Sequence, residues 1–489
     1  MATQGLLTAT RRDFLKAAGG LVVAISLPVY LDQRQALAAS ITPPGKFGPL
    51  TVPGDQIDSW LAVARDGSVT VLTGKVELGT GTVTATRQIV AEELDVAFEK
   101  TSLVQGVTGQ TVDQGYTAGS QTIRTQWATG LRIAAASARQ ALLGMAATRL
   151  GVTADRLTVS KGVVSVVGDS SKTVSYGELL GGARFGAAVS NQVRPKSSSK
   201  YTVVGQSLPR EDIPAKMFGQ FEYVQDVTVP GMLHARMVRP ARPAPLAGSP
   251  TAIARTITGT LANATLASAD ESSVNHLPGF VKLVTKGSLV AVVARREEQA
   301  IAAAQALKVT WNDPASLPEQ AALYDTIQNA TRFNTRVIQN SGDVDGALSG
   351  AANVLQATYL HPYQAHASIG PSCAVADVHD GVAEVWSPTQ GVYQLRGAVA
   401  TALGLPQQNV RVNYVEGSGC YGINGADDVS ISAALISQAV GKPVRLQYMR
   451  ADEISWENYG TPMVMNLKAG LDASGAIVGW DYHGWTENR

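Results

Sequence analysis

Three glycine-rich clusters constrain the fold of this chain more than any other feature. They lie at residues 77–81, 116–122 and 417–422, and each comes shortly before a helical pattern. Glycine has no Cβ, so it lets the backbone approach a ligand closely and adopts left-handed conformations without strain. The chain has 48 glycines among its 489 residues. Their clustering indicates backbone that lies against a ligand rather than general flexibility.

The rest of the pattern predicts an α+β chain with more than one domain. A hairpin is expected around Asp66-Gly67, and the polar stretch 190–200 is typical of a linker. The segment 201–312 changes character and is expected to be a compact domain of its own. The expected strands are 60–64, 69–72, 102–106, 219–224, 233–238, 289–293, 308–311, 410–415 and 476–480, and the expected helices are 84–94, 123–150, 297–307 and 429–440.

The third cluster allows three interpretations. Gly417-Ser418-Gly419-Cys420-Tyr421-Gly422 has the G-x-G-x-x-G spacing of a dinucleotide-binding turn, so an NAD-dependent dehydrogenase is one of them. Against it, Asp427 and Asp428 stand before the expected helix and would repel a pyrophosphate. The acidic residue should also follow after about 20 positions, whereas Asp452 comes 30 positions after Gly422. A plain structural turn is the second interpretation. Backbone amides that bind another anionic cofactor are the third, and the favoured one.

Composition excludes several classes of protein. The net charge of +1 gives no strong field for nucleic acid or an anionic membrane. The two cysteines, Cys373 and Cys420, form none of the usual motifs for an iron–sulfur cluster or a c-type haem. A disulfide between them stays open. His361 and His366 are five positions apart, on different faces of a helix, which argues against a zinc site held by the protein.

The first 38 residues have the three parts of an export signal. Arg11-Arg12 stands in a twin-arginine pattern, an apolar run follows at 17–31, and Ala36-Leu37-Ala38 is a small-x-small cleavage site. The apolar run is short for a bilayer span. The twin-arginine route carries folded proteins. We therefore expect a protein of the periplasm, or of the outer side of the inner membrane, that acquires its cofactor before export.

Together, the clusters and the middle segment resemble the molybdenum-cofactor subunits of the xanthine oxidase family. The nearest branch is that of the isoquinoline 1-oxidoreductase beta subunit and the nicotinate dehydrogenase large subunit. The resemblance covers nearly all of residues 55–489. It implies a first part of the cofactor domain at 55–190, an inserted α/β hammerhead-like domain at 201–312, and a second part at 345–489. The motifs that carry it are Lys75–Gly81, Ile89–Asp95, Pro230–Ala235, Pro278–Val281, Trp386–Gln390 and Gly417–Asp428.

The resemblance implies a molybdenum–pterin cofactor, either molybdopterin or its cytosine dinucleotide form. The first two clusters would contact the pterin and its phosphate, and Gln390 would lie near the metal. The third cluster would pass beside the metal, with Tyr421 lining the substrate channel. The metal's sulfur ligands come from the pterin, so a bond from Cys420 to the metal is not expected. The expected cofactor-binding residues are Gly79, Thr80, Gly81, Gly119, Ser120, Gln121, Thr122, Gln390, Gly419, Cys420, Tyr421 and Gly422.

The implied reaction is hydroxylation of an aldehyde carbon or of a carbon next to the nitrogen of a small heteroaromatic ring. Water supplies the oxygen, and a glutamate acts as the base. Two electrons must then leave. Since this chain has no cluster motif, they are expected to pass to a small [2Fe-2S] subunit, and a cytochrome c is a candidate for the next carrier.

The sequence departs from the family pattern at three places. Thr80 stands where the family commonly has Gln, and Gly370 stands where the segment like His366–Pro371 has Glu. The family's catalytic glutamate lies in a Gly-Glu motif that would come after Arg489. No catalytic residue is therefore assigned, and we expect a C-terminally truncated subunit. A non-catalytic truncated or split-gene fragment stays as the alternative.

Three charged residues near the clusters are expected to have ordinary roles. Glu77 is expected at the surface or in a turn rather than as a substitute base. Arg124 and Arg132, on the long helix, are expected to form a solvated face, although Arg124 is also a candidate to meet a phosphate.

Overall fold

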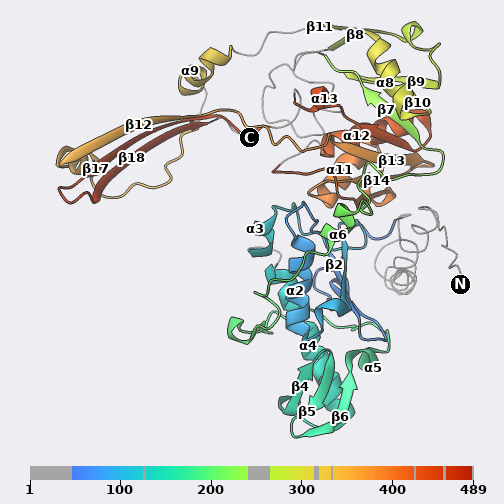
Figure 1. Ribbon diagram of the computed structural model, residues 1–489, viewed down its shortest axis with the longest axis vertical. Helices are drawn as coiled ribbons and strands as arrows, with labels where there is room; N and C mark the ends of the chain where they lie inside the picture. The colour runs from blue at the N-terminus through green and yellow to red at the C-terminus, as the bar shows by residue number, and fades with distance from the viewer. Residues whose placement is uncertain are drawn as a thin grey trace, which may run out of the picture. The chain divides into compact units, whose positions relative to one another are not determined.

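The chain divides into two units (Figure 1). The structure, a computed structural model, describes residues 47–124, 128–240, 265–312, 319–331, 334–422, 426–454 and 459–486. Unit 1 comprises Met1–Phe221 and His379–Tyr414, and unit 2 comprises Glu222–Val378 and Val415–Arg489. Helices and strands are mixed in both units, which confirms the α+β prediction. The predicted export signal, with Arg11 and Arg12, lies outside the described residues.

Unit 1 contains a three-stranded sheet covered by two helices. Its strands are β1 (Leu61–Val63), β2 (Val69–Thr73) and β3 (Thr101–Gln105), in that order. β1 and β2 form the predicted hairpin, whereas β2 and β3 are parallel because α2 (Thr82–Leu94) connects them. α4 (Ala128–Leu150) has alanines and leucines three or four positions apart, and these pack into one core with the buried residues of α2.

The later part of the chain returns to unit 1 as a strand, a helix and a strand. β14 (Val382–Ser387) and β15 (Val410–Tyr414) are parallel, with α11 (Val392–Leu403) between them. The backbone of β15 also bonds to the loop after β3, through Tyr414 N–H and Gly106 O at 2.8 Å. The other elements of unit 1 are β4 (Leu157–Ser160), β5 (Val163–Val166), β6 (Asp169–Ser175), α3 (Ser120–Thr122), α5 (Tyr176–Leu180), α6 (Asp212–Met217) and 3-10 turns at Ile57–Ser59, Phe98–Lys100, Ala154–Arg156, Ser198–Lys200 and Gln407–Asn409.

Unit 2 contains strands β13 (Cys373–His379), β16 (Val444–Gln447), β7 (Leu233–Met237), β10 (Leu289–Ala294) and β9 (Phe280–Lys286), which lie side by side in that order. A second, three-stranded sheet has the order β12 (Asn353–His361), β17 (Met463–Leu471) and β18 (Ile477–Thr486). β18 begins at Ile477 and so confirms the strand predicted at 476–480 from its second residue onward. The remaining elements are β8 (Thr265–Asp270), β11 (Lys308–Asn312), α8 (Glu297–Ala306), α9 (Leu323–Gln328), α10 (Val344–Ser349), α12 (Ala426–Val440), α13 (Arg450–Ile454) and 3-10 turns at Glu271–Ser273 and Gln320–Ala322.

The strand predicted at 219–224 is wrong. Gly219 follows α6 with a φ of 65°, and the N–H groups of Gln220 and Phe221 donate back to Ala215 O at 2.8 and 3.1 Å. A left-handed glycine followed by such backward bonds is a typical way for a helix to end. The start of this segment therefore closes α6, and residues 219–224 form no strand. Within the described ranges, no helix combines the length and the apolar character that a membrane crossing needs.

Candidate functional site

The first glycine cluster forms the turn that leads into α2. Gly79 and Gly81 have φ values of 92° and 81°, a region that glycine adopts without strain. The carboxylate of Glu77, which is 1% exposed, accepts hydrogen bonds from Gly81 N–H at 2.8 Å, Val83 N–H at 3.0 Å and the Thr82 hydroxyl at 3.1 Å. A carboxylate here satisfies N–H groups that lack helical partners and is favoured by the helix dipole. Glu77 therefore has the turn role that was one of its two expected roles, and it is buried rather than at the surface.

The second cluster lies against the first. Thr117 is fully buried, and its Oγ1 accepts a hydrogen bond from Val76 N–H at 3.1 Å. Lys75 Nζ donates to Tyr116 O at 2.6 Å. Burial lowers the pKa of Lys75, although the charge of Asp113 opposes the shift. Residues 75–76, directly before the first cluster, and residues 116–117, about 40 positions later in the sequence, are thus joined directly.

Gln390, from the later part of the chain that belongs to unit 1, contacts Thr117 of the second cluster. Its backbone oxygen accepts from Thr117 N–H at 2.8 Å, and its Nε2 donates to Thr117 O at 3.0 Å. Gln390 stands between β14 and α11, 273 positions after Thr117. The structure therefore brings together the two clusters and the glutamine that the sequence singled out separately.

Several backbone N–H groups are free at this junction. Those of Thr80, Gly119 and Ser120 have no hydrogen-bond partner among the residues that the structure describes. Thr80 and Gly119 are neighbours, because a Cβ placed on Gly119 would lie 3.6 Å from Thr80 Cγ2. A Cβ placed on Gly79 would meet nothing within 4 Å. Free amides beside open space fit an anionic group such as a pterin phosphate.

The other predicted residues of these clusters differ in what they can offer a ligand. Gly81 N–H is bonded to Glu77, so it is not available to a phosphate. Thr122 Oγ1 accepts from Ala118 N–H at 2.7 Å, and its own N–H donates to Gly119 O at 3.1 Å. Thr122 therefore shapes the turn, whereas the side chains of Ser120 and Gln121 are exposed. Direct cofactor contacts from all four remain predictions.

Arg210 is a residue of this site that the sequence did not indicate. Its Nη1 donates to Gly79 O at 2.8 Å, and its Nη2 lies 4.0 Å from the Glu77 carboxylate. Asp212 pairs with the same guanidinium, with 3.0 Å between Arg210 Nε and Asp212 Oδ1. Burial alone would raise the pKa of Asp212, but hydrogen bonds and charges from Arg210 and Lys216 lower it to about 2. No local sequence signal marks Arg210, which lies 131 positions after Gly79.

The third cluster belongs to unit 2, where it packs against the segment 366–371. Ser368 Oγ donates to Gly419 O at 2.9 Å, and Gln225 Nε2 donates to Ser418 Oγ at 3.0 Å. A Cβ on Gly370 would collide with the side chain of Ser418. The glycine that replaces the family's glutamate at position 370 therefore gives the room in which the third cluster lies.

The cysteine and the tyrosine of the third cluster have opposite environments. Cys420 is 3% exposed, and its Sγ lies 3.4 Å from Gly422 O. Burial raises the pKa of this thiol. Cys373 is also buried, and both cysteines are free, so the disulfide left open by the sequence does not form. Tyr421 is 61% exposed and has a φ of 53°, a strained conformation for an aromatic residue. Its role in lining a substrate channel remains a prediction.

Two family matches bear on these sites. A model described as a molybdopterin cofactor-binding domain matches residues 36–229, and a second model with the same description matches residues 327–488. The first match contains the Gly79–Gly81 and Gly119–Thr122 clusters, and the second contains Gln390 and the Gly417–Gly422 cluster.

Three curated proteins are similar to this chain in sequence. A nicotinate dehydrogenase subunit of Pseudomonas putida is 40% identical over 90% of this chain and 36% of its own length. A membrane-bound aldehyde dehydrogenase (pyrroloquinoline-quinone) of Gluconacetobacter polyoxogenes is 28% identical over 97% of this chain and 60% of its own length. The isoquinoline 1-oxidoreductase beta subunit of Brevundimonas diminuta is 28% identical over 94% of this chain and 62% of its own length.

The chain thus spans less than two thirds of the length of each of these relatives. Both molybdopterin domains are nevertheless matched, and the amide-rich junction found in unit 1 fits the cofactor that they bind. The chain therefore belongs to the molybdopterin-binding oxidoreductases of the xanthine oxidase family.

Proposed function

We propose that this chain is the cofactor-binding subunit of a molybdenum-dependent hydroxylase that acts on a small N-heteroaromatic compound or an aldehyde. The observation that carries the proposal is the junction of unit 1, where Thr80, Gly119 and Ser120 present free N–H groups beside open space. When bound, the molybdenum–pterin cofactor would supply the redox chemistry and activate water as the oxygen source.

The residues of the chain would bind and orient this cofactor. The amides of Thr80, Gly119 and Ser120 would hold its phosphate, and the Glu77 cap would keep the turn before α2 rigid. Gln390, fixed through both of its bonds to Thr117, would present its remaining amide oxygen to the cofactor. Tyr421, in the third cluster, would contact the substrate.

We also propose a partner and a location. The electrons would leave through a small [2Fe-2S] subunit and then a cytochrome c, since the cysteines of this chain form no cluster motif. The twin-arginine pattern at Arg11-Arg12 supports export of the folded complex to the periplasm.

The test is turnover in ¹⁸O-labelled water. The chain would be produced with its candidate iron–sulfur subunit in a bacterium that makes the cofactor, then supplied with nicotinate, isoquinoline or benzaldehyde and an artificial electron acceptor. The proposal predicts a hydroxylated product that carries ¹⁸O, together with visible absorption from iron–sulfur centres in the complex. Bound molybdenum without turnover on any of these would instead support the alternative of a cofactor-binding chain that does not catalyse. Saturable binding of NADH, with no molybdenum, would favour the nicotinamide interpretation.

A further inference from the structure

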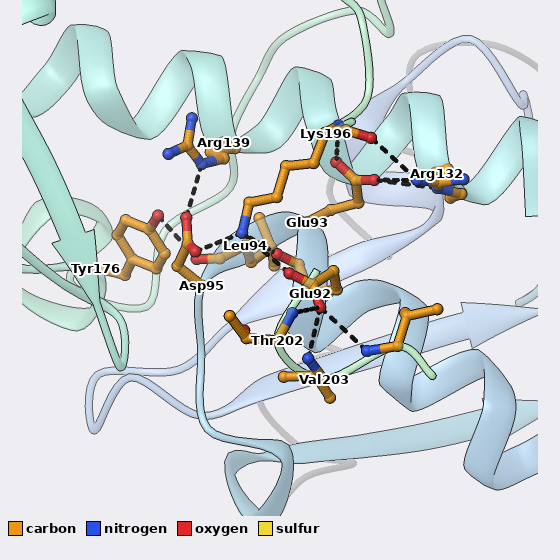
Figure 2. Close-up of polar contacts among 11 residues, drawn as sticks. Glu92, Glu93, Leu94, Asp95, Arg132, Arg139, Tyr176, Lys196, Thr202 and Val203 are labelled. Atoms are coloured by element: carbon orange, nitrogen blue, oxygen red, sulfur yellow. Dashed lines mark hydrogen bonds and ion pairs between the residues drawn. The ribbon is translucent and has the colours of Figure 1, made fainter. Parts of the chain in front are cut away.

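Three acidic residues crowd the carboxyl end of α2: Glu92, Glu93 and Asp95 (Figure 2). The helix dipole disfavours negative charge there, and Glu92 and Glu93 are each 1% exposed. Basic side chains of α4 and of the stretch 190–200 form ion pairs with these acidic residues. Arg132 lies 3.0 Å from Glu93, and Arg139 lies 2.9 Å from Asp95. The expectation that Arg132 belongs to a solvated face is therefore wrong, because its charge neutralises a buried carboxylate.

Lys196, in the stretch 190–200, also binds to these acidic residues. Its Nζ pairs with Asp95, lies 3.4 Å from Glu92 Oε1 and donates to Glu92 O at 2.5 Å. Its backbone N–H donates to Glu93 Oε2 at 3.0 Å. The stretch 190–200, expected as a linker, is thus held against α2 at this point.

The second oxygen of Glu92 holds the next part of the same segment. Oε2 accepts three backbone N–H groups, from Thr202 at 2.8 Å, Val203 at 2.6 Å and Val204 at 3.0 Å. Figure 2 shows the N–H groups of Thr202 and Val203 pointing toward the carboxylate. Burial alone would raise the pKa of Glu92, but these three bonds and Lys196 outweigh it, so the pKa is lowered. Three consecutive amides on one charged oxygen make a strong local lock.

From this lock the segment runs along α2 toward the amino end of the helix. Gln88, one turn before Glu92, donates through Nε2 to Val203 O at 3.0 Å and to Gln206 O at 3.1 Å. Arg87 forms an ion pair with Glu211. Later residues of the segment contact earlier residues of α2, so the segment and the helix run in opposite directions. α2 rises about 16 Å between Glu92 and Gly81, which the residues from Val203 to Arg210 can span.

The segment ends at the cofactor-binding turn. Arg210 Nη1 donates to Gly79 O at 2.8 Å, and a Cβ on Gly81 would lie 3.3 Å from Arg210 Cδ. In a trans peptide the C=O of one residue and the N–H of the next point in opposite directions. The bond from Arg210 to the oxygen of Gly79 therefore sets the direction of Thr80 N–H, one of the free amides of the junction.

We propose that residues 196–212 form a strap that aims Thr80 N–H at the cofactor, with Glu92 as the lock at one end of α2 and Arg210 as the positioning residue at the other. The strap itself is independent of the proposed function. Only its effect on cofactor binding rests on that function, so the two are tested by separate measurements.

The first measurement is residue-resolved hydrogen exchange on the full chain without cofactor. Arg210→Gln is expected to speed exchange by about tenfold or more at Gly81, the amide next to Thr80, whose N–H donates to Glu77 in the same turn, and to leave residues 202–204 unchanged. Glu92→Gln is expected to speed exchange at 202–204 and also at Gly81. Gln88→Ala is a milder break of the same strap and is expected to act in the same direction. Arg156→Gln and Glu271→Gln, at exposed positions, are the matched controls.

The second measurement is the rate at which molybdenum is lost from the loaded chain during buffer exchange. Loss is expected to be at least about fivefold faster in Arg210→Gln and Glu92→Gln, and Arg210→Lys should restore part of the retention because it keeps a donor for Gly79 O. The strap is refuted if Glu92→Gln or Gln88→Ala loosens 202–204 while Gly81 exchanges at the wild-type rate. Its role in cofactor binding is refuted if exchange at Gly81 rises but molybdenum retention does not change. A wild-type chain that binds no molybdenum refutes the proposed function, and the exchange data still decide whether the strap exists.

Discussion

The Glu77 carboxylate offers the most direct test of how the first cluster is built. It is 1% exposed and accepts two backbone N–H groups and one hydroxyl at the start of α2. Glu77→Gln keeps one acceptor oxygen but turns an NH₂ group toward a donor. A hydrogen bond to a charged group contributes about 1.5–3 kcal/mol, and a charge at a helix end contributes up to about 2 kcal/mol. Some of this is recovered by relaxation, so the first turn of α2 should open more easily by about 2–4 kcal/mol.

Hydrogen exchange measures this opening directly. Since about 1.4 kcal/mol corresponds to a factor of ten, the amides of Gly81 and Val83 should exchange roughly 30-fold to several-hundred-fold faster in Glu77→Gln. Amides in the middle of α4 should not change. Glu271→Gln, an exposed glutamate of unit 2, is the matched control. An increase below about threefold at Gly81 and Val83 would show that Glu77 does not cap the helix.

Three further predictions concern other parts of the chain. Gly106→Ala should lower the thermal unfolding midpoint. Gly106 has a φ of 56°, and an added Cβ would lie 2.6 Å from side-chain atoms of two neighbouring residues. Gly144→Ala, on the open side of α4, is the control and should leave the midpoint equal or higher. Cys373 and Cys420 should react slowly with a thiol reagent in the native chain, since burial raises both pKa values, that of Cys373 to about 12. Both cysteines should react once the chain is unfolded without reductant. A lack of reactive thiols in the unfolded chain would indicate a disulfide. Asp212→Asn should lower the unfolding midpoint at neutral pH, and its difference from wild type should shrink as the pH falls from 4 toward 2. The reason is that a carboxylate whose pKa is lowered from 3.8 to about 2 stabilises the fold only while it is charged. A difference that stays constant over this range would contradict the pairing with Arg210.

Local features of unit 1 were predictable because short-range chemistry decides them. Asp66-Gly67 between two apolar alternations indicates a hairpin, and the 3.6-residue spacing of alanine and leucine indicates α4. The strand expected at 219–224 failed for a local reason too, since Gly219 closes α6.

The site depended on contacts that no local pattern contains. Glycine clusters indicate where backbone can approach a ligand, but the bonds between Thr117 and Gln390 join residues 273 positions apart. Arg210 reaches Gly79 over 131 positions and stands in a stretch without any motif. Arg132 was expected on a solvated face because helical periodicity alone cannot show that another segment covers the buried glutamate beside it.

The most direct test of the account is the molybdenum and pterin content of the purified chain. The chain would be produced in a bacterium that makes the cofactor, and molybdenum would be measured by mass spectrometry and pterin by fluorescence after acid oxidation. The account predicts that folded chain retains molybdenum and pterin in equal amounts. A chain that shows native circular dichroism but carries neither would contradict the assignment of the junction at Thr80, Gly119 and Ser120 as a cofactor site.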